Sequence, residues 1–119
     1  MLPLGLAAVL ALAGPGSAAP DGALPAYSPT EDMSCAAWAA FSAGSTDDDT
    51  VGEGFGYAMN YFLGRYEAAT GGGDFTSALD AALAKLTSSQ DDFDKVEAMC
   101  LPRWQAYLDR LDNWQRESE

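Results

Sequence analysis

Histidine is absent from this chain of 119 residues, and basic residues are scarce, with 6 Lys and Arg against 18 Asp and Glu. Without an imidazole, Ser-His-Asp and Cys-His catalysis are excluded, and the usual nitrogen ligand of metal ions is missing. The formal net charge of -12 repels phosphate backbones and anionic lipid heads. The composition therefore argues against binding to nucleic acid or to a membrane surface.

Motifs for catalysis and cofactor binding are missing as well. The chain has no Gly-x-Ser-x-Gly elbow, no phosphate loop and no dinucleotide fingerprint. Counted from Asp47, the EF-hand glycine is present at Gly52, but the twelfth position is Ala58 instead of glutamate. We therefore expect no catalytic residue, no metal and no cofactor, and the acidic run Asp47-Asp48-Asp49 is interpreted as a helix start. A small hydrolase with two carboxylates is a distant alternative.

The first residues resemble an export signal. Leu2 to Ala13 form an uninterrupted apolar run, too short to span a bilayer, and small residues follow up to Ala19. We expect residues 1–19 to be a cleavable signal peptide, with cleavage after Ala18 or Ala19; the alternative is a buried N-terminal helix. No second long apolar run follows, so we expect no membrane insertion of the mature chain. This predicts a periplasmic or secreted protein.

The chain has little cysteine, only Cys35 and Cys100. Two cysteines cannot complete a structural zinc site of four Cys or His ligands, and their spacing is not that of a redox-active Cys-x-x-Cys pair. In an oxidising compartment these residues are expected to form one disulfide. Two buried free thiols are the alternative.

We expect residues 28–119 to form a single all-α domain, a small bundle of about four helices tied by the disulfide, after a flexible lead-in at residues 20–27. Ser28-Pro29-Thr30-Glu31 is a capping box with proline at the first helical position. The helix that begins there is expected to run to Ser42, with Gly44 as its stop.

Three more helices are expected, each with marked ends. The second lies between an opening segment at residues 45–49 and the glycines 71–73. The third begins after Asp74 and the fourth after Ser89, and the fourth continues to the end of the chain. Apolar residues recur every three or four positions in all of them, and no segment alternates with period two.

Two features are unusual for helix interiors. Pro102 donates no amide hydrogen, so we expect a kink or a short break just after Cys100. In the second helix, small residues form a stripe at steps of four: Gly52, Gly56, Asn60 and Gly64. The stripe suggests the close approach of another helix, or else a weak N-terminal half of this one.

Most of the aromatic residues are expected in the core. The second helix presents one apolar stripe, made of Val51, Phe55, Met59, Phe62 and Tyr66. Tyr57 and Tyr61 lie off this stripe, and Trp114 lies near the end of the last helix. These three are our candidates for a surface that binds a partner, although isolated exposed aromatics are common. Arg65 is expected to pair with a nearby carboxylate.

Three short segments carry a resemblance to a known family: Ser34-Cys35, Tyr61-Phe62-Leu63-Gly64-Arg65 and Met99-Cys100-Leu101-Pro102. With the N-terminal signal and a cysteine in the first and last helices, the chain resembles the HdeA-like family of periplasmic acid-stress chaperones. The resemblance implies a homodimer that loosens in acid and exposes apolar surface to unfolding client proteins. Without histidine, only carboxylates sense falling pH in this chain.

Two functions from different classes follow. The first is a non-enzymatic binding protein of the cell envelope, acting as a pH-responsive chaperone. The second is a protein inhibitor or immunity-type partner, whose acidic surface binds a basic target protein.

Overall fold

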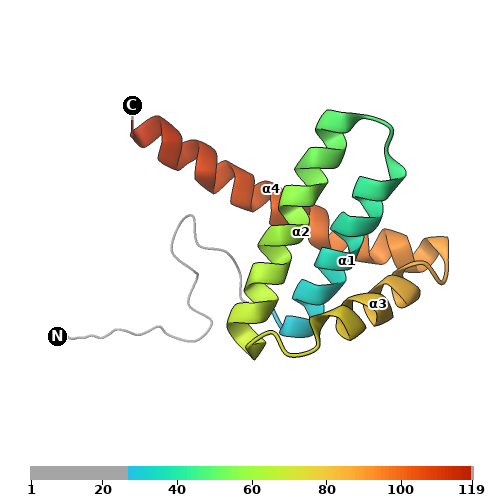
Figure 1. Ribbon diagram of the computed structural model, residues 1–119. Coiled ribbons are helices and arrows are strands. Elements are labelled where there is room, and N and C mark those ends of the chain that lie inside the picture. The colour runs from blue at the N-terminus through green and yellow to red at the C-terminus, as the bar shows by residue number, and fades with distance from the viewer. Residues whose placement is uncertain (1–26, 119) are drawn as a thin grey trace.

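The computed structural model describes residues 27–118, and within them the chain forms helices and no strands. The helices are α1 (Pro29–Ser45), α2 (Asp49–Thr70), α3 (Phe75–Leu86) and α4 (Gln90–Glu117) (Figure 1). The predicted all-α bundle of four helices is confirmed for this part of the chain. The predicted signal peptide at residues 1–19 and residues 20–26 of the lead-in lie outside the described residues.

Local capping explains where most of the helices begin and end. The Ser28 hydroxyl accepts a hydrogen bond from the Glu31 amide at 3.1 Å, and the Glu31 carboxylate accepts one from the Ser28 amide at 2.9 Å. This reciprocal pair is the predicted capping box. Asp74 and Ser89 cap α3 and α4 as expected. Gly71 ends α2 in the left-handed conformation, with φ of 83°, which glycine adopts without steric cost.

The predicted end of the first helix is wrong by three residues. Gly44 keeps helical backbone angles, and α1 continues to Ser45, whose hydroxyl donates to the Phe41 carbonyl at 2.7 Å. A glycine stops a helix only where the backbone turns left-handed, and here it does not. Ser45 therefore belongs to α1, and α2 is opened by the Asp48 side chain, which accepts from the Val51 amide at 3.0 Å.

Of the kink or short break expected at Pro102, the break is absent, because α4 runs without interruption from Gln90 to Glu117. The proline leaves the Ala98 carbonyl without its usual amide donor. Both Ala98 and Pro102 lie on the exposed side of the helix, where water can satisfy that carbonyl. The helix therefore continues at little cost.

The small-residue stripe of α2 does not receive another helix. A Cβ atom added at Gly56 or Gly64 would meet no atom within 4 Å outside its own helix. At Gly52 it would make ordinary contacts, at 3.5 and 3.6 Å, with Thr46 and Ala43 where α1 ends. The interpretation as a close helix–helix contact is therefore wrong.

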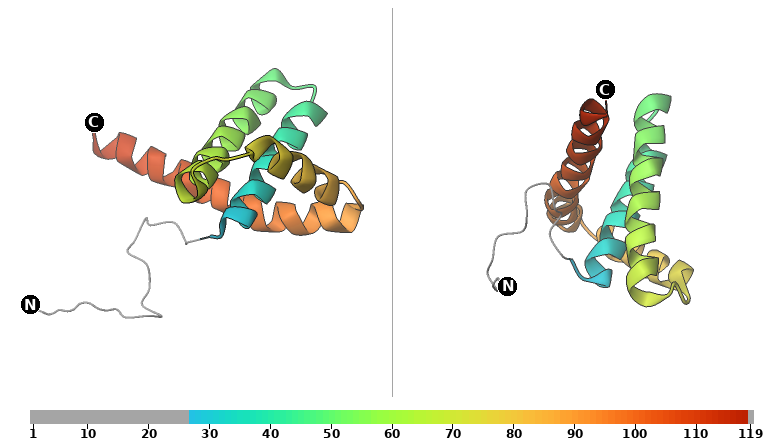
Figure 2. Two further views of the ribbon diagram at one scale, coloured as in Figure 1. Left: turned by 60° about the horizontal axis from the view of Figure 1, so that its bottom comes forward. Right: turned by 90° about the vertical axis from the view of Figure 1, so that its left-hand side faces the viewer.

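Helix α1 lies at the centre and packs against each of the other three helices (Figures 1 and 2). Its sequence explains this position, because almost every residue from Asp32 to Ala39 is buried, and the alanines among them allow close approach. Trp38 is fully buried. Its ring and that of Phe55 pack edge to face with their centres 5.4 Å apart, and its indole N–H donates to the Glu97 carboxylate at 3.2 Å. The core therefore forms around α1.

The predicted disulfide is present. Cys35 of α1 and Cys100 of α4 are bonded, with their Cα atoms 5.3 Å apart, and both are fully buried. The bond joins residues 65 positions apart in sequence. It fixes the middle of the last helix to the central one.

Candidate functional site

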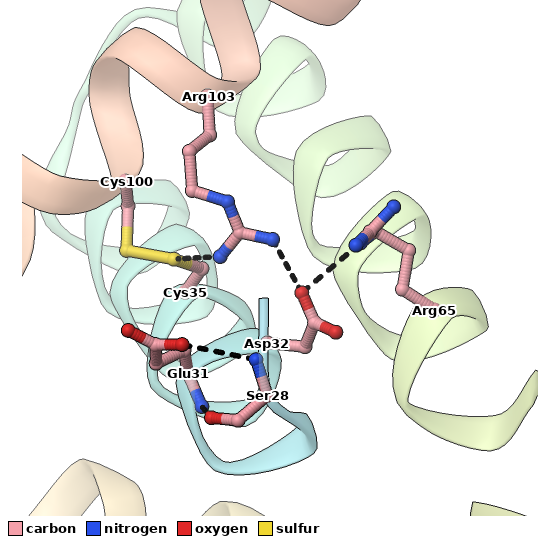
Figure 3. Close-up of polar contacts among 7 residues, drawn as sticks. All are labelled: Ser28, Glu31, Asp32, Cys35, Arg65, Cys100 and Arg103. Atoms are coloured by element: carbon pink, nitrogen blue, oxygen red, sulfur yellow. Dashed lines mark hydrogen bonds and ion pairs between the residues drawn. A yellow bond between two sulfur atoms is a disulfide. The ribbon is translucent and has the colours of Figure 1, made fainter. Parts of the chain in front are cut away.

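A buried cluster of charged side chains lies beside the disulfide, where α1, α2 and α4 meet (Figure 3). Asp32 lies one helical turn before Cys35, and Arg103 lies one turn after Cys100. Arg103 Nη2 donates to Asp32 Oδ1 at 2.5 Å, and Arg65 Nε of α2 donates to the same oxygen at 3.1 Å. One carboxylate therefore serves two guanidinium groups.

The members of this ion cluster (Asp32, Arg65 and Arg103) differ in burial. Asp32 is 2% exposed and Arg103 is 6% exposed, whereas the Arg65 side chain is 29% exposed. Burying an ionised group is costly unless it is paired and hydrogen-bonded. Asp32 thus offsets a desolvation cost that is large for Arg103 and smaller for Arg65.

Arg103 is enclosed on its remaining sides. Its Nη1 donates to the sulfur of Cys35 at 3.2 Å, and its guanidinium lies 3.5 Å from the ring centre of Tyr27 and 5.0 Å from that of Phe62. Charge on an aromatic face adds stabilisation in a desolvated site. Tyr27, which was expected in the flexible lead-in, is therefore packed against the bundle.

Three pKa shifts describe the surroundings of the cluster. Burial lowers the pKa of Arg65, but the hydrogen bond to Asp32 and the attraction of its charge outweigh this, so the pKa is raised overall. Burial raises the pKa of Tyr61, which lies near Arg65. The backbone and side-chain hydrogen bonds from Ser28 lower the pKa of Glu31. Asp32 consequently holds Arg65 in its charged form.

Only part of this cluster was predicted from the sequence. The expected pairing of Arg65 with a carboxylate is confirmed, and the partner is Asp32. The pair of Asp32 and Arg103 was not predicted. The sequence feature that could have indicated this pair is its spacing, because Asp32 lies one turn from Cys35 and Arg103 lies one turn from Cys100. Residues one turn from two bonded cysteines can face each other.

A second feature is an open groove between α2 and α4, of about 420 Å³. Tyr61 stacks on Tyr107 at 4.1 Å between ring centres and lies 5.8 Å from Trp104. Of the three predicted partner-binding residues, Tyr57 and Tyr61 line this groove together, whereas Trp114 lies farther along α4. Tyr57 is 61% exposed and Trp114 is 65% exposed, while Tyr61 is half-buried in the ring stack.

The acidic run at residues 47–49 serves the start of α2, since Asp48 caps that helix. Among residues 27–118, no three acidic or cysteine side chains gather as they would around a metal ion. In the same range, no helix combines the length and apolar character needed to cross a membrane. The features with unusual chemistry in this part of the chain are thus the ion cluster and the aromatic groove.

Comparison with known proteins adds no relative, since no family model, curated protein or solved structure matches this chain.

Proposed function

We propose that this chain is an exported, non-enzymatic protein that binds unfolding client proteins at acidic pH, as the HdeA-like chaperones do. The observation that carries the proposal is the buried carboxylate of Asp32, which serves as counter-ion to Arg103 and Arg65 where three helices meet. Acid removes the charge of a carboxylate and leaves that of an arginine unchanged. The same cluster that stabilises the bundle at neutral pH therefore destabilises it in acid.

The groups around Asp32 set the sign of this effect. Arg65 faces it from α2 and Arg103 from α4, while Glu31 is its neighbour on α1. Once the carboxylates are protonated, the two guanidinium groups lack a counter-ion and repel each other in a poorly hydrated site. Displacement of α2 from α1 and α4, which the disulfide keeps joined, would relieve that repulsion. It would also uncover the ring of Phe62, on which Arg103 lies.

Carboxylates outside the ion cluster act in the same direction. Hydrogen bonds from Ser28 lower the pKa of Glu31, and hydrogen bonds from Ser77 lower that of Asp74. A carboxylate whose pKa is lowered by folding stabilises the fold above its unfolded pKa, near 4, and loses that contribution as pH falls through its folded pKa. Full protonation also changes the net charge from -12 to +6, the charge of the basic residues alone. Stability is thus expected to fall below about pH 4.

The proposal is tested by light scattering from an acid-sensitive enzyme that aggregates at pH 2–3. The chain is expected to suppress this aggregation in proportion to its concentration and to have no effect on heat-induced aggregation at pH 7. Tryptophan fluorescence of the chain alone should show loosening over the same pH range. An aggregation curve at pH 2–3 that the chain leaves unchanged at every molar ratio would count against the proposal.

Asp32→Asn tests whether the ion cluster is the trigger. Asparagine has nearly the same shape and no charge, so the variant should loosen, and suppress aggregation, at less acidic pH than the wild type. Asp80→Asn is the matched control, because Asp80 is exposed on α3. If the two variants keep the same pH profile, the trigger lies elsewhere.

A further inference from the structure

The exposed apolar residues of α4 continue the groove between α2 and α4. The groove is lined by Tyr57 and Tyr61 of α2 and by Trp104, Tyr107, Leu108 and Leu111 of α4. Beyond it, Trp114 follows Leu111 by three positions. Each of these α4 residues, from Trp104 to Trp114, has another of them three or four positions away, so they lie on one side of the helix. Together with Tyr57 and Tyr61 they form one surface, which we call the α2–α4 strip.

The outer part of this strip has no covering helix in the described part of the chain. The last turns of α4 project beyond the rest of the bundle (Figures 1 and 2). Leu108 is 42% exposed and Leu111 is 44% exposed. Single exposed apolar residues are ordinary, but a continuous row beside a groove is typical of an interaction surface.

The length of the strip indicates what kind of group fits it. Ten residues separate Trp104 from Trp114, which corresponds to about 15 Å along a helix. A small molecule would fill the groove beside Tyr57 and leave the rest of the strip in water. A helix of three turns, with apolar residues on one side, would cover all of it.

The charge of the chain indicates whether a second copy or another protein binds the strip. A second copy would bring its own net charge of -12 against the same charge. The last turns of α4 carry almost no net charge, because they contain two basic residues and three acidic ones: Arg110, Arg116, Asp109, Asp112 and Glu117. Arg116 also forms an ion pair with Asp112. On the α2 side, the exposed Glu53 lies one turn before Tyr57. The net charge of the whole chain therefore favours a positively charged partner over a second copy.

We propose that the α2–α4 strip binds, at neutral pH, an amphipathic helix of another protein that carries basic residues beside its apolar face. The apolar face packs on Tyr57, Leu108 and Leu111, and the basic residues lie in the negative field of the bundle. This interaction needs the folded bundle. It does not depend on acid-induced binding of client proteins.

The test uses two synthetic helical peptides of 18 residues with the same leucine face, one with lysine and one with glutamate on the other face. Binding to the oxidised chain is measured at pH 7 by calorimetry and by the fluorescence of Trp104 and Trp114. The lysine peptide is expected to bind, to bind more weakly as salt is raised, and to shift the tryptophan emission to the blue. The glutamate peptide is expected not to bind.

Variants locate the binding site. Leu108→Ser combined with Leu111→Ser should weaken binding of the lysine peptide about tenfold or more, without changing the charge of the chain. Val51→Ser is the matched control, because Val51 is 44% exposed on α2 and does not line the groove. Circular dichroism checks that the variants remain folded, as substitutions at exposed positions should.

Four outcomes would overturn the proposal. The first two are equal binding of the two peptides and no binding of the lysine peptide. The third is that Val51→Ser weakens binding as much as the double leucine variant does. The fourth is that the wild type sediments as a dimer and that Leu111→Ser dissociates this dimer. The last result would assign the strip to a second copy. All measurements are made at pH 7, so failure of acid-induced chaperone activity does not affect them.

Discussion

Asp32→Asn is expected to lower the free energy of unfolding at pH 7 by about 3–5 kcal/mol, the usual cost of removing one partner from a buried ion pair. The substitution keeps the shape of the side chain and removes its charge. Arg103, which is 6% exposed, then stays buried without a counter-ion, and Arg65 lies beside it with the same charge. Urea unfolding followed by circular dichroism measures the loss. It is a large part of the roughly 5–15 kcal/mol of a typical domain.

Two further variants separate charge from packing. Arg65→Ala should cost only about 1 kcal/mol or less, because Arg65 is partly exposed and Arg103 still neutralises Asp32. Adding Arg103→Met to Asp32→Asn should recover part of the loss, since the buried positive charge is then removed as well. If Asp32→Asn is no more destabilising than Asp80→Asn, the cluster has no important role in stability.

The ends of the helices were largely predictable because they depend on short-range chemistry. Ser28 with Glu31, Asp74 and Ser89 supply hydrogen-bond acceptors to free amides, and Gly71 adopts a conformation that other residues avoid. Each of these signals is complete within four residues of sequence. The predicted stop at Gly44 and the predicted break at Pro102 were wrong, because the effects of these residues depend on surroundings outside that window.

The packing around α1 and the ion cluster depended on long-range contacts. The disulfide could be inferred because the chain has only two cysteines, but burial of Asp32 and Arg103 requires knowing which sides of α1 and α4 face each other. The apolar spacing of α4 predicted a helix that continues to the end of the chain. Leu108 and Leu111 are nevertheless exposed, because α4 continues past the helices that could cover them. Periodicity shows that a face is apolar and leaves open what covers it.

Removal of the disulfide is the second change expected to have a large effect. Cys35→Ser combined with Cys100→Ser should lower the free energy of unfolding by about 4 kcal/mol, because the bond closes a loop of 65 residues in the unfolded chain. Serine is a better replacement than alanine at position 35, because its hydroxyl oxygen can still accept the hydrogen bond that Arg103 donates to the Cys35 sulfur. Urea unfolding of the oxidised wild type and of the double variant, both at pH 7, measures the difference.

The loss should be accompanied by selective loosening of α4. In the described part of the chain, the other polar ties between α4 and α1 are the hydrogen bonds that Arg103 donates to Asp32 and to the residue at position 35, and the hydrogen bond from Trp38 to Glu97. Amide hydrogen exchange should therefore accelerate first in α4, while the α1–α2 hairpin keeps more of its protection. Reduced wild type should behave like the double variant, but reduction should be slow under native conditions, because both sulfur atoms are fully buried. Uniform acceleration in all four helices would instead mean that the bundle opens as one unit, with α4 no more dependent on the disulfide than α2.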